Sequence, residues 1–401
     1  MILFTSLLII LSAFLICESI LHNRNLRRIP LRITVSGTRG KSSVVRTLAS
    51  VMRVAGYTVV AKTTGSEAML ILPDGSEEPV KRRGRITIME QKNLVRQAVR
   101  IKANCLITEI MSIHPENHWI ETQRLLKPHL TIFTNFRADH LDVVRNNLKE
   151  ISMLHANDIF PGSRVVIHET EINEFIREEV IKAKSEVVLA KTGNPAYSLS
   201  LQIPINIELV TASAQLLSVS QEVIERGIRE TNLDIGRPRV FRFDGSNGPV
   251  WFVNSFAAND PFSTLQLMER VLSLLNLENP VVSGLICLRS DRGERSRQWL
   301  DLLAGEGKGT FTRIYAIGTH ARLFGRTLPE CEVVTGYRLP VGAGTKAGPY
   351  SGAIARHASR IIHQSPPNSI IFGLANIVGR GREFVDYWSI AGTEITMEEA
   401  R

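Results

Sequence analysis

Short apolar runs alternate with amphipathic helical patterns over most of the chain, which is typical of parallel α/β architecture. A first series of strands is expected at residues 33–36, 105–110, 130–134, 165–168 and 187–190. A second series is expected at residues 250–254, 281–288, 314–318 and 370–374. A turn with glycine and proline at residues 233–239 separates the two series and predicts a domain boundary there. Residues 73–85, PDGSEEPVKRRGR, are expected to form an exposed loop.

The N-terminal segment has the pattern of a membrane anchor. Residues 1–17 carry no charge, and a basic cluster follows them, made of His22, Arg24, Arg27, Arg28 and Arg32. A helix of this length spans about 26 Å, and continuing it through Leu21 would match the ~30 Å hydrocarbon core. We therefore predict a single-pass anchor helix at residues 1–21, with the remaining chain in the cytoplasm because the arginines flank its C-terminal side. A buried core helix is the alternative, and a removable signal peptide is disfavoured because no basic residue precedes the apolar run.

Composition limits the possible classes of protein. The 401 residues are too many for one ordinary core, and 44% hydrophobic with 22% charged residues is a globular composition. The net charge of +9 suits nucleic acid, anionic lipid or an acidic substrate, but no nucleic-acid-reading module is recognisable, so no nucleic-acid partner is predicted. The scattered cysteines have neither zinc-site spacing nor the density of a disulfide framework, which fits a reducing cytosol. They are Cys17, Cys105, Cys287 and Cys331.

The stretch ITVSGTRGKSS at residues 33–43 places a glycine loop between an expected strand and an expected helix at residues 44–55. Backbone N–H groups in such a loop converge on one point and the helix N-terminus adds partial positive charge, so the loop suits a phosphate. Lys41 would reach the outer phosphates of ATP, and the Ser42 hydroxyl would bind Mg²⁺. The string is the shorter G-x-x-G-K-S form, for which an ordinary glycine turn is the alternative. The expected ATP-binding residues are Gly37, Thr38, Arg39, Gly40, Lys41, Ser42 and Ser43.

Two further groups of polar residues follow expected strands, where open α/β sheets bind their ligands. Glu109 leaves a buried apolar run, and such a carboxylate needs either a cation such as Mg²⁺ or a structural salt bridge. In TNFRADHLD, Asn135, Asp139, His140 and Asp142 lie just past another strand, although a DH pair alone is more often a helix cap. Together with the glycine loop, these two groups predict Lys41, Glu109 and His140 as catalytic residues. The predicted metal ligands are Ser42, Glu109 and His140.

GTRGKSS, Glu109 and TNFRADHLD occur in the order found in Mur-type ligases, the ATP-dependent amide-forming family that includes folylpolyglutamate synthases. FVNSFAANDPFSTL at residues 252–265 resembles the segment that opens the C-terminal domain of that family. The resemblance implies that Asn259 and Arg237 help to hold the nucleotide. It also implies a P-loop-containing parallel-sheet ATPase domain at residues 28–233, followed by a smaller Rossmann-like α/β domain at residues 237–401.

A closer resemblance is to the ligase subunits of poly-γ-glutamate synthases. It extends from the N-terminal segment through VAKTTGSEA, FVNSFAAND, CLRSDRGERSRQW and GLANIVG, nearly the whole chain. It implies an ATP- and Mg²⁺-dependent acid–amino-acid ligase that extends a poly-γ-glutamate chain at the cell membrane, beside small membrane and surface subunits of CapC and CapA type. Arg289, Asp291 and Arg292 are candidates for binding substrate or nucleotide, with ordinary surface charges as the alternative. Basic residues near positions 81–102 would guide the polyanion or contact anionic lipid.

One departure from the family pattern concerns a lysine that many Mur-type ligases carbamylate after the DH pair. HANDIF at residues 155–160 stands at the corresponding place, with Asn157 where that lysine would fall. Asparagine cannot be carbamylated, so a second metal would need other support, for which Asp158 and His155 are candidates. Two rival functions stay open: another Mur-type ligase, acting on a peptidoglycan or folylpolyglutamate-like substrate, and a non-ligating ATPase of a capsule export complex.

Overall fold

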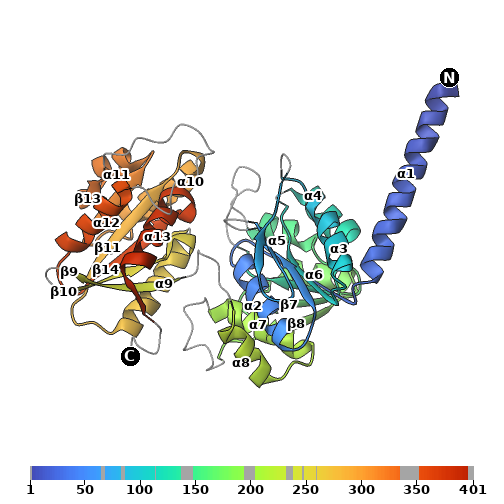
Figure 1. Cartoon of the computed structure of the whole chain (residues 1–401), viewed down its shortest axis with the longest axis horizontal. Coiled ribbons are helices and arrows are strands. Elements are labelled where there is room, and N and C mark those ends of the chain that lie inside the picture. The colour runs from blue at the N-terminus through green and yellow to red at the C-terminus, as the bar shows by residue number, and fades with distance from the viewer. Residues whose placement is uncertain are drawn as a thin grey trace. The chain divides into compact units, whose positions relative to one another are not determined.

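The structure is a computed structural model that describes residues 2–64, 68–82, 86–112, 114–136, 148–193, 204–231, 238–245, 248–258, 260–334 and 352–395. Contacts divide the chain into two compact units, whose boundary lies between residues 233 and 234. Each unit contains one twisted sheet covered by helices on both faces (Figure 1). The expected α/β fold class is therefore confirmed.

The first unit is built on an eight-stranded sheet in the order β4-β3-β2-β5-β1-β6-β7-β8. The six strands from β2 to β8 in this order are parallel, and β3 and β4 add an antiparallel edge. The central strand β1 lies between β5 and β6, so the residues that follow these three strands share one edge of the sheet. The strands are β1 (Leu31–Ser36), β2 (Val59–Lys62), β3 (Met69–Ile71), β4 (Glu77–Pro79), β5 (Cys105–Glu109), β6 (Leu130–Phe133), β7 (Arg164–His168) and β8 (Glu186–Ala190).

Alternating strand residues bury the two faces of this sheet against different helices. Cys105 and Ile107 of β5 pack with α2 (Lys41–Val54), α7 (Pro204–Leu216) and α8 (Gln221–Arg229). Leu106, which lies between them, points to the other face and packs with α3 (Glu90–Arg100) and η1 (Glu121–Leu126). That face also carries α5 (Leu148–Ala156) and α6 (Glu174–Lys182), and α4 (Pro115–Ile120) runs into η1.

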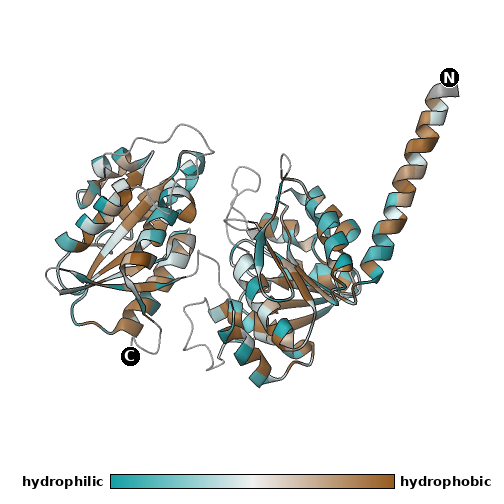
Figure 2. Cartoon of the chain, viewed as in Figure 1, coloured by the Kyte–Doolittle hydropathy of each residue, from teal (hydrophilic) through white to brown (hydrophobic). Residues whose placement is uncertain are grey.

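The N-terminal helix α1 (Ile2–Arg27) is a single element, and Figure 2 shows it hydrophobic over most of its length. By length and composition it could cross a membrane, and its apolar stretch is exposed. It continues past the predicted end at residue 21, because its C-terminal part packs on the first unit. There Leu26 is buried with α3, and Glu18 pairs with Lys92 at 2.8 Å.

The second unit has a seven-stranded sheet in the order β13-β12-β11-β14-β10-β9-β15. The five strands β10 to β14 are parallel, and β9 pairs antiparallel with both β10 and β15. Its strands are β9 (Val240–Gly245), β10 (Gly248–Val253), β11 (Val281–Leu288), β12 (Arg313–Gly318), β13 (Cys331–Val333), β14 (Ser369–Ala375) and β15 (Thr393–Ile395). Its helices are η3 (Phe256–Ala258), α9 (Pro261–Leu275), η4 (Ser290–Arg292), α10 (Gly293–Ala304), α11 (Ala321–Thr327), α12 (Gly352–Gln364), η5 (Ile377–Gly381) and α13 (Arg382–Ala391).

All nine expected strands are present, five in the first sheet and four in the second. One expectation is wrong: the segment at residues 73–85 is not all loop, because it contains β4, which pairs with β3 in antiparallel register. The sequence Glu-Glu-Pro of β4 has no apolar position, so pattern alone gave no sign of this edge strand.

Candidate active site at the edge of the first sheet

The glycine loop, residues 37–40, connects the end of β1 to the start of α2. Gly37 and Gly40 have φ angles of 113° and 82°, a region that favours glycine. A Cβ atom on Gly37 would also lie 2.3 Å from Thr134 Oγ1 and 2.9 Å from the Asn135 carbonyl oxygen. The loop therefore needs glycine for both its backbone conformation and its close approach to the segment after β6.

Asn135 holds the glycine loop from the neighbouring strand. Its carbonyl accepts a 2.9 Å hydrogen bond from Thr38 N, and its side-chain Oδ1 accepts one of 3.1 Å from Arg39 N. Its Nδ2 donates to the Arg39 carbonyl at 3.1 Å. Because Asn135 is the second residue after β6, the register between β1 and β6 fixes the position of the loop.

Lys41 is the first residue of α2, and its side chain turns back over the glycine loop. Its Nζ donates to the Gly37 carbonyl at 2.5 Å and to the Thr38 carbonyl at 3.3 Å. Ser42 and Ser43 follow in the first turn and are partly buried. The loop thus combines a lysine cation with the N-terminus of a 14-residue helix, an arrangement that favours a phosphate.

Glu109 ends β5 and pairs in register with Val35 of β1, just before the glycine loop. The carboxylate is 1% exposed, and Oε2 accepts a 2.5 Å hydrogen bond from Thr64 Oγ1. Oε1 is also buried but has no hydrogen-bond partner among the described residues. Such an oxygen is costly unless a cation binds it. The donor set therefore fits a hard divalent cation such as Mg²⁺.

Gln91 and Glu121, which sequence reasoning did not single out, support the end of β5. Gln91 Nε2 donates to the Glu109 carbonyl at 3.0 Å and to Glu121 Oε1 at 2.5 Å. Glu121 also accepts from Met111 N at 3.0 Å and Ser112 Oγ at 2.5 Å. Burial raises the pKa of Glu121 despite these hydrogen bonds. The pair fixes the backbone from the Glu109 carbonyl to Ser112, directly after the Glu109 side chain.

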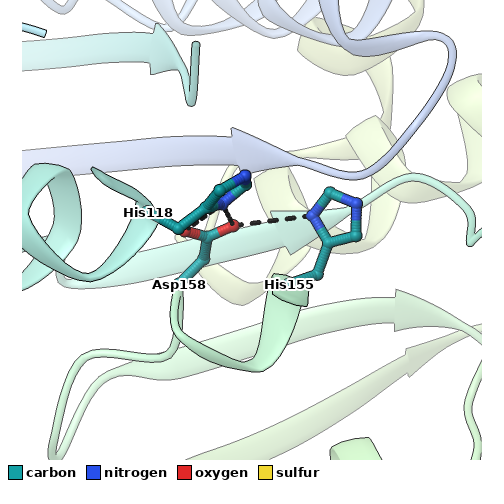
Figure 3. A group of neighbouring side chains, drawn as sticks. All are labelled: His118, His155 and Asp158. Carbon is teal, nitrogen blue, oxygen red and sulfur yellow. Dashed lines mark hydrogen bonds and ion pairs between the residues drawn. The ribbon is translucent and has the colours of Figure 1, made fainter. Parts of the chain in front are cut away.

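In the HANDIF segment, His155 and Asp158 contact Ser36, the residue before the glycine loop, whereas Asn157 does not. The Asn157 amide turns back to donate to the Met153 and Leu154 carbonyls at 3.1 and 3.0 Å. His155 and Asp158 are buried together with His118 of α4, and Figure 3 shows the Asp158 carboxylate between the two imidazoles. Asp158 and His155, the two candidates for supporting a second metal, both belong to this buried cluster.

The remaining predicted site residues fall into two groups. His140, Arg237 and Asn259 lie outside the described residues. Arg289, Asp291 and Arg292 follow β11 in the second unit, where Arg289 Nε donates to Asp291 Oδ1 at 2.9 Å. This ion pair, with its hydrogen bond, lowers the pKa of Asp291.

A second polar group at the same edge of the second sheet includes Asn376, which follows β14. Its Nδ2 donates to the Cys287 carbonyl at 2.8 Å, and its Oδ1 accepts from Arg295 Nη1 at 2.6 Å. Ala375 before it has φ of 73°, unusual for a residue with a Cβ atom and a kind of strain that clusters at functional sites.

Comparisons with solved structures agree with this architecture. Escherichia coli FolC in complex with DHPP and ADP has a TM-score of 0.64 at 15% identity, covering 93% of this chain and 91% of that one. MurF from Acinetobacter baumannii has a TM-score of 0.62 at 15% identity, covering 92% and 79%. At these identities the likeness concerns the fold.

Sequence comparisons define the family. The Mur ligase middle domain matches residues 35–229, and the poly-gamma-glutamate synthase CapB C-terminal domain matches residues 240–390. PGA synthase CapB of Bacillus subtilis (strain 168) is 28% identical over 393 residues, covering 95% of this chain and 96% of that protein. Capsule biosynthesis protein CapB of Bacillus anthracis is 32% identical over 293 residues, covering 71% of this chain and 62% of that protein.

The fold and these domain matches define the chain as an ATP-dependent amide ligase of the Mur type. Within that class, the chain belongs to the CapB family, because a CapB C-terminal domain follows the Mur ligase middle domain and the Bacillus subtilis relative matches along nearly its whole length.

Proposed function

We propose that this chain is the ligase of a poly-γ-glutamate synthase, which activates a glutamate carboxylate with ATP and joins it to the amine of another glutamate. The observation that carries the proposal is the buried Oε1 of Glu109, which has no partner among the described residues. It lies one strand away from the glycine loop that leads into Lys41. The names of the two Bacillus relatives supply the polymer as the product.

The reaction has two steps with separate demands. First, a carboxylate oxygen attacks the γ-phosphorus of ATP, so that ADP leaves and an acyl phosphate forms. The amine then attacks the carbonyl carbon, the carbon–oxygen bond to phosphate breaks, inorganic phosphate leaves and the nitrogen loses a proton. Phosphoryl transfer mainly needs positioning and charge neutralisation, and the second step builds an oxyanion.

The glycine loop and Lys41 would hold the outer phosphates. Lys41 Nζ already lies at the loop, where it donates to the Gly37 and Thr38 carbonyls. When nucleotide binds, it would exchange these hydrogen bonds for ones to phosphate oxygens. Ser42, Glu109 and His140 are the proposed ligands of Mg²⁺, which would supply positive charge to the phosphates. Asn259 and Arg237 are proposed nucleotide contacts, and Arg289, Asp291 and Arg292 are proposed to contact glutamate or nucleotide.

The proposed location is the cell membrane, with α1 as a single-pass anchor and both units in the cytoplasm. Support comes from the exposed apolar stretch of α1 and the basic residues Arg24 and Arg27 in its last turn. Small membrane and surface subunits of CapC and CapA type are the proposed partners, and the growing poly-γ-glutamate chain is the proposed acidic substrate.

The test supplies membranes that contain the chain and its companion subunits with ATP, Mg²⁺ and labelled glutamate. Labelled polymer with ADP release is expected, and Lys41→Ala is expected to abolish it. Lys182→Ala, which removes an exposed lysine paired with Glu179, is the matched control and should retain activity. Phosphate release without any labelled product would instead favour the non-ligating ATPase, and normal turnover of Lys41→Ala would refute the role of the loop.

A further inference from the structure

A buried polar cluster lies directly below the glycine loop and joins distant parts of the first unit. Its members are Ser36, His118, His155 and Asp158, none more than 7% exposed. The Asp158 carboxylate accepts from His118 Nδ1 at 2.8 Å and from Ser36 Oγ at 2.5 Å. Figure 3 shows the carboxylate between the two imidazoles. His155 Nδ1 lies 3.6 Å from Asp158 Oδ2.

The charges in this cluster are balanced. Burial alone would lower the pKa of His118, but the Asp158 carboxylate outweighs burial and raises it. Burial alone would raise the pKa of Asp158, but the charge of His118 and the hydrogen bonds lower it. Both shifts therefore favour the ion pair of an Asp158 carboxylate with a protonated His118. Burial lowers the pKa of His155. Because Ser36 Oγ donates its hydrogen to Asp158, it accepts from His155 Nδ1 at 2.9 Å.

Ser36 links this pair to the nucleotide site. It is the last residue of β1, immediately before Gly37, and its carbonyl accepts a 3.0 Å hydrogen bond from Thr134 N. Its hydroxyl forms hydrogen bonds with Asp158 and His155, so both the backbone and the side chain of Ser36 are fixed. Lys41 lies within electrostatic range of both imidazoles, because its positive charge opposes the protonation of each.

Stability does not explain such a cluster. Replacing a buried ion pair with well-packed apolar residues is often neutral or stabilising, whereas a satisfied polar network fixes one arrangement. A metal is also a poor fit, because both oxygens of Asp158 already accept hydrogen bonds, Oδ1 from Thr122 and His118 and Oδ2 from Ser36. What the cluster does fix is the point where the chain leaves β1 and enters the glycine loop.

We propose that Asp158 and Ser36 are positioning residues for nucleotide: Asp158 holds the Ser36 hydroxyl, and Ser36 sets where the glycine loop begins. This rests on the proposed function of the loop. His118 offsets the charge of the Asp158 carboxylate, so the cluster next to the loop has no net negative charge that would repel phosphate.

The test measures the Kd of Mg²⁺-ADP and the KM values on the full-length protein with single and double variants. Ser36→Ala and Asp158→Asn are each expected to raise the nucleotide Kd about tenfold or more, because small misplacements in a binding site are costly. The KM for glutamate should not change. The double variant should bind little worse than either single variant, because the two residues act as one unit.

Thr34→Val is the matched control. Thr34 is a buried residue of the same strand, two positions before Ser36, and its hydroxyl bonds to Thr131 Oγ1 at 3.1 Å and not to the Asp158 carboxylate. It should lower the melting temperature without changing the nucleotide Kd. If Asp158→Asn does not fold, the comparison of Ser36→Ala with Thr34→Val decides the question.

Four outcomes would overturn the proposal. Unchanged affinity in Ser36→Ala, or strictly additive losses in the double variant, would show that the cluster does not position the loop, while the proposed function would stand. Stoichiometric binding of Zn²⁺ or Mn²⁺ to nucleotide-free protein, lost in His118→Gln, would show that the cluster is a metal site instead. No binding of nucleotide by the unchanged protein at any Mg²⁺ concentration would refute the proposed function as well.

Discussion

At the scale of single residues, Glu109 combines a cost in stability with a use in catalysis. Its buried Oε1 has no hydrogen-bond partner among the described residues, so this oxygen costs stability unless a cation binds it. Glu109→Gln is therefore expected to raise the unfolding free energy by about 1 kcal/mol in the absence of divalent metal. The same variant should lose the extra stabilisation that Mg²⁺-nucleotide gives and should lower kcat about 100-fold or more.

Thermal unfolding with and without Mg²⁺-ADP would measure both effects. Glu78→Gln is a suitable control, because it removes an exposed carboxylate from the edge strand β4. A Glu109→Gln protein that is less stable without metal, or equally stabilised by Mg²⁺-nucleotide, would contradict the assignment of this carboxylate as a metal ligand.

The ion pair of His118 and Asp158 predicts a stability profile against pH. The groups facing His118 are Asp158, Glu121, Lys41 and His155, and Asp158 is the main cause of its raised pKa. The raised pKa of His118 contributes stability that is lost as pH rises through it. The lowered pKa of Asp158 contributes stability that is lost as pH falls through it.

The pair should therefore stabilise the protein fully between about pH 4 and pH 6.5, the ordinary values of the two groups. Breaking it with Asp158→Asn should cost about 3 kcal/mol in that range and less on either side. Melting temperatures of the unchanged protein and this variant across the pH range would give the difference. A difference that does not vary with pH would mean that the two groups are not ionised together.

The sequence predicts some site residues and not others, depending on whether the surrounding pattern shows that the side chain is buried. Glu109 could be identified because a carboxylate at the end of an apolar strand has few explanations. His118 and Glu121 lie in short helices, α4 and η1, where polar residues normally face solvent, and only the tertiary structure shows that these two are buried. Asn157 was judged by its place in a motif, whereas its side chain turns back to its own helix.

At the scale of elements, the glycine loop depends on glycine for two separable reasons. Gly37→Ala would strain a φ of 113° and also place Cβ against Thr134 Oγ1 and the Asn135 backbone. Gly56→Ala would strain a φ of 90° with nothing within 4 Å, so it measures backbone strain alone. We expect about 1 kcal/mol of destabilisation for Gly56→Ala and a larger loss for Gly37→Ala.

Nucleotide affinity separates the two variants further. Gly37→Ala should weaken Mg²⁺-ADP binding about 100-fold, because the displaced loop no longer presents its N–H groups at one point. Gly56→Ala should bind nucleotide normally. Equal affinities in equilibrium titrations would show that the loop does not hold the phosphates.

Which strands the sequence predicts follows from how each is buried. Central strands such as β11 and β14 are covered on both faces, so they appear as mostly apolar runs. Edge strands β4 and β15 have few buried positions and form because a neighbouring strand offers free backbone groups. Their pairing is a tertiary effect, so the sequence pattern of residues 73–85 predicts a loop and not a strand.

At the scale of the whole molecule, α1 has two parts with different surroundings. From Glu18 onward it packs on the first unit, through the pairing of Glu18 with Lys92 and a 2.9 Å contact of His22 Nε2 with the Leu125 carbonyl. Leu26 and the following Ile29 are buried in the core beside α3. This docking was not predicted, because the basic cluster after the apolar run suggested an end at the membrane surface.

The two parts of α1 should separate in truncation experiments. Deleting residues 2–17 removes only exposed apolar surface, so the protein should leave the membrane fraction on carbonate extraction and keep its melting temperature. Deleting residues 2–29 also removes Leu26 and Ile29 from the core and should cost about 2 kcal/mol per buried side chain. Fractionation and thermal unfolding of both variants would measure this. If the protein lacking residues 2–17 stayed in the membrane fraction, its membrane-binding surface would lie elsewhere on the first or second unit. If that deletion unfolded the protein, the exposed stretch would be structural and the helix would not be an independent anchor.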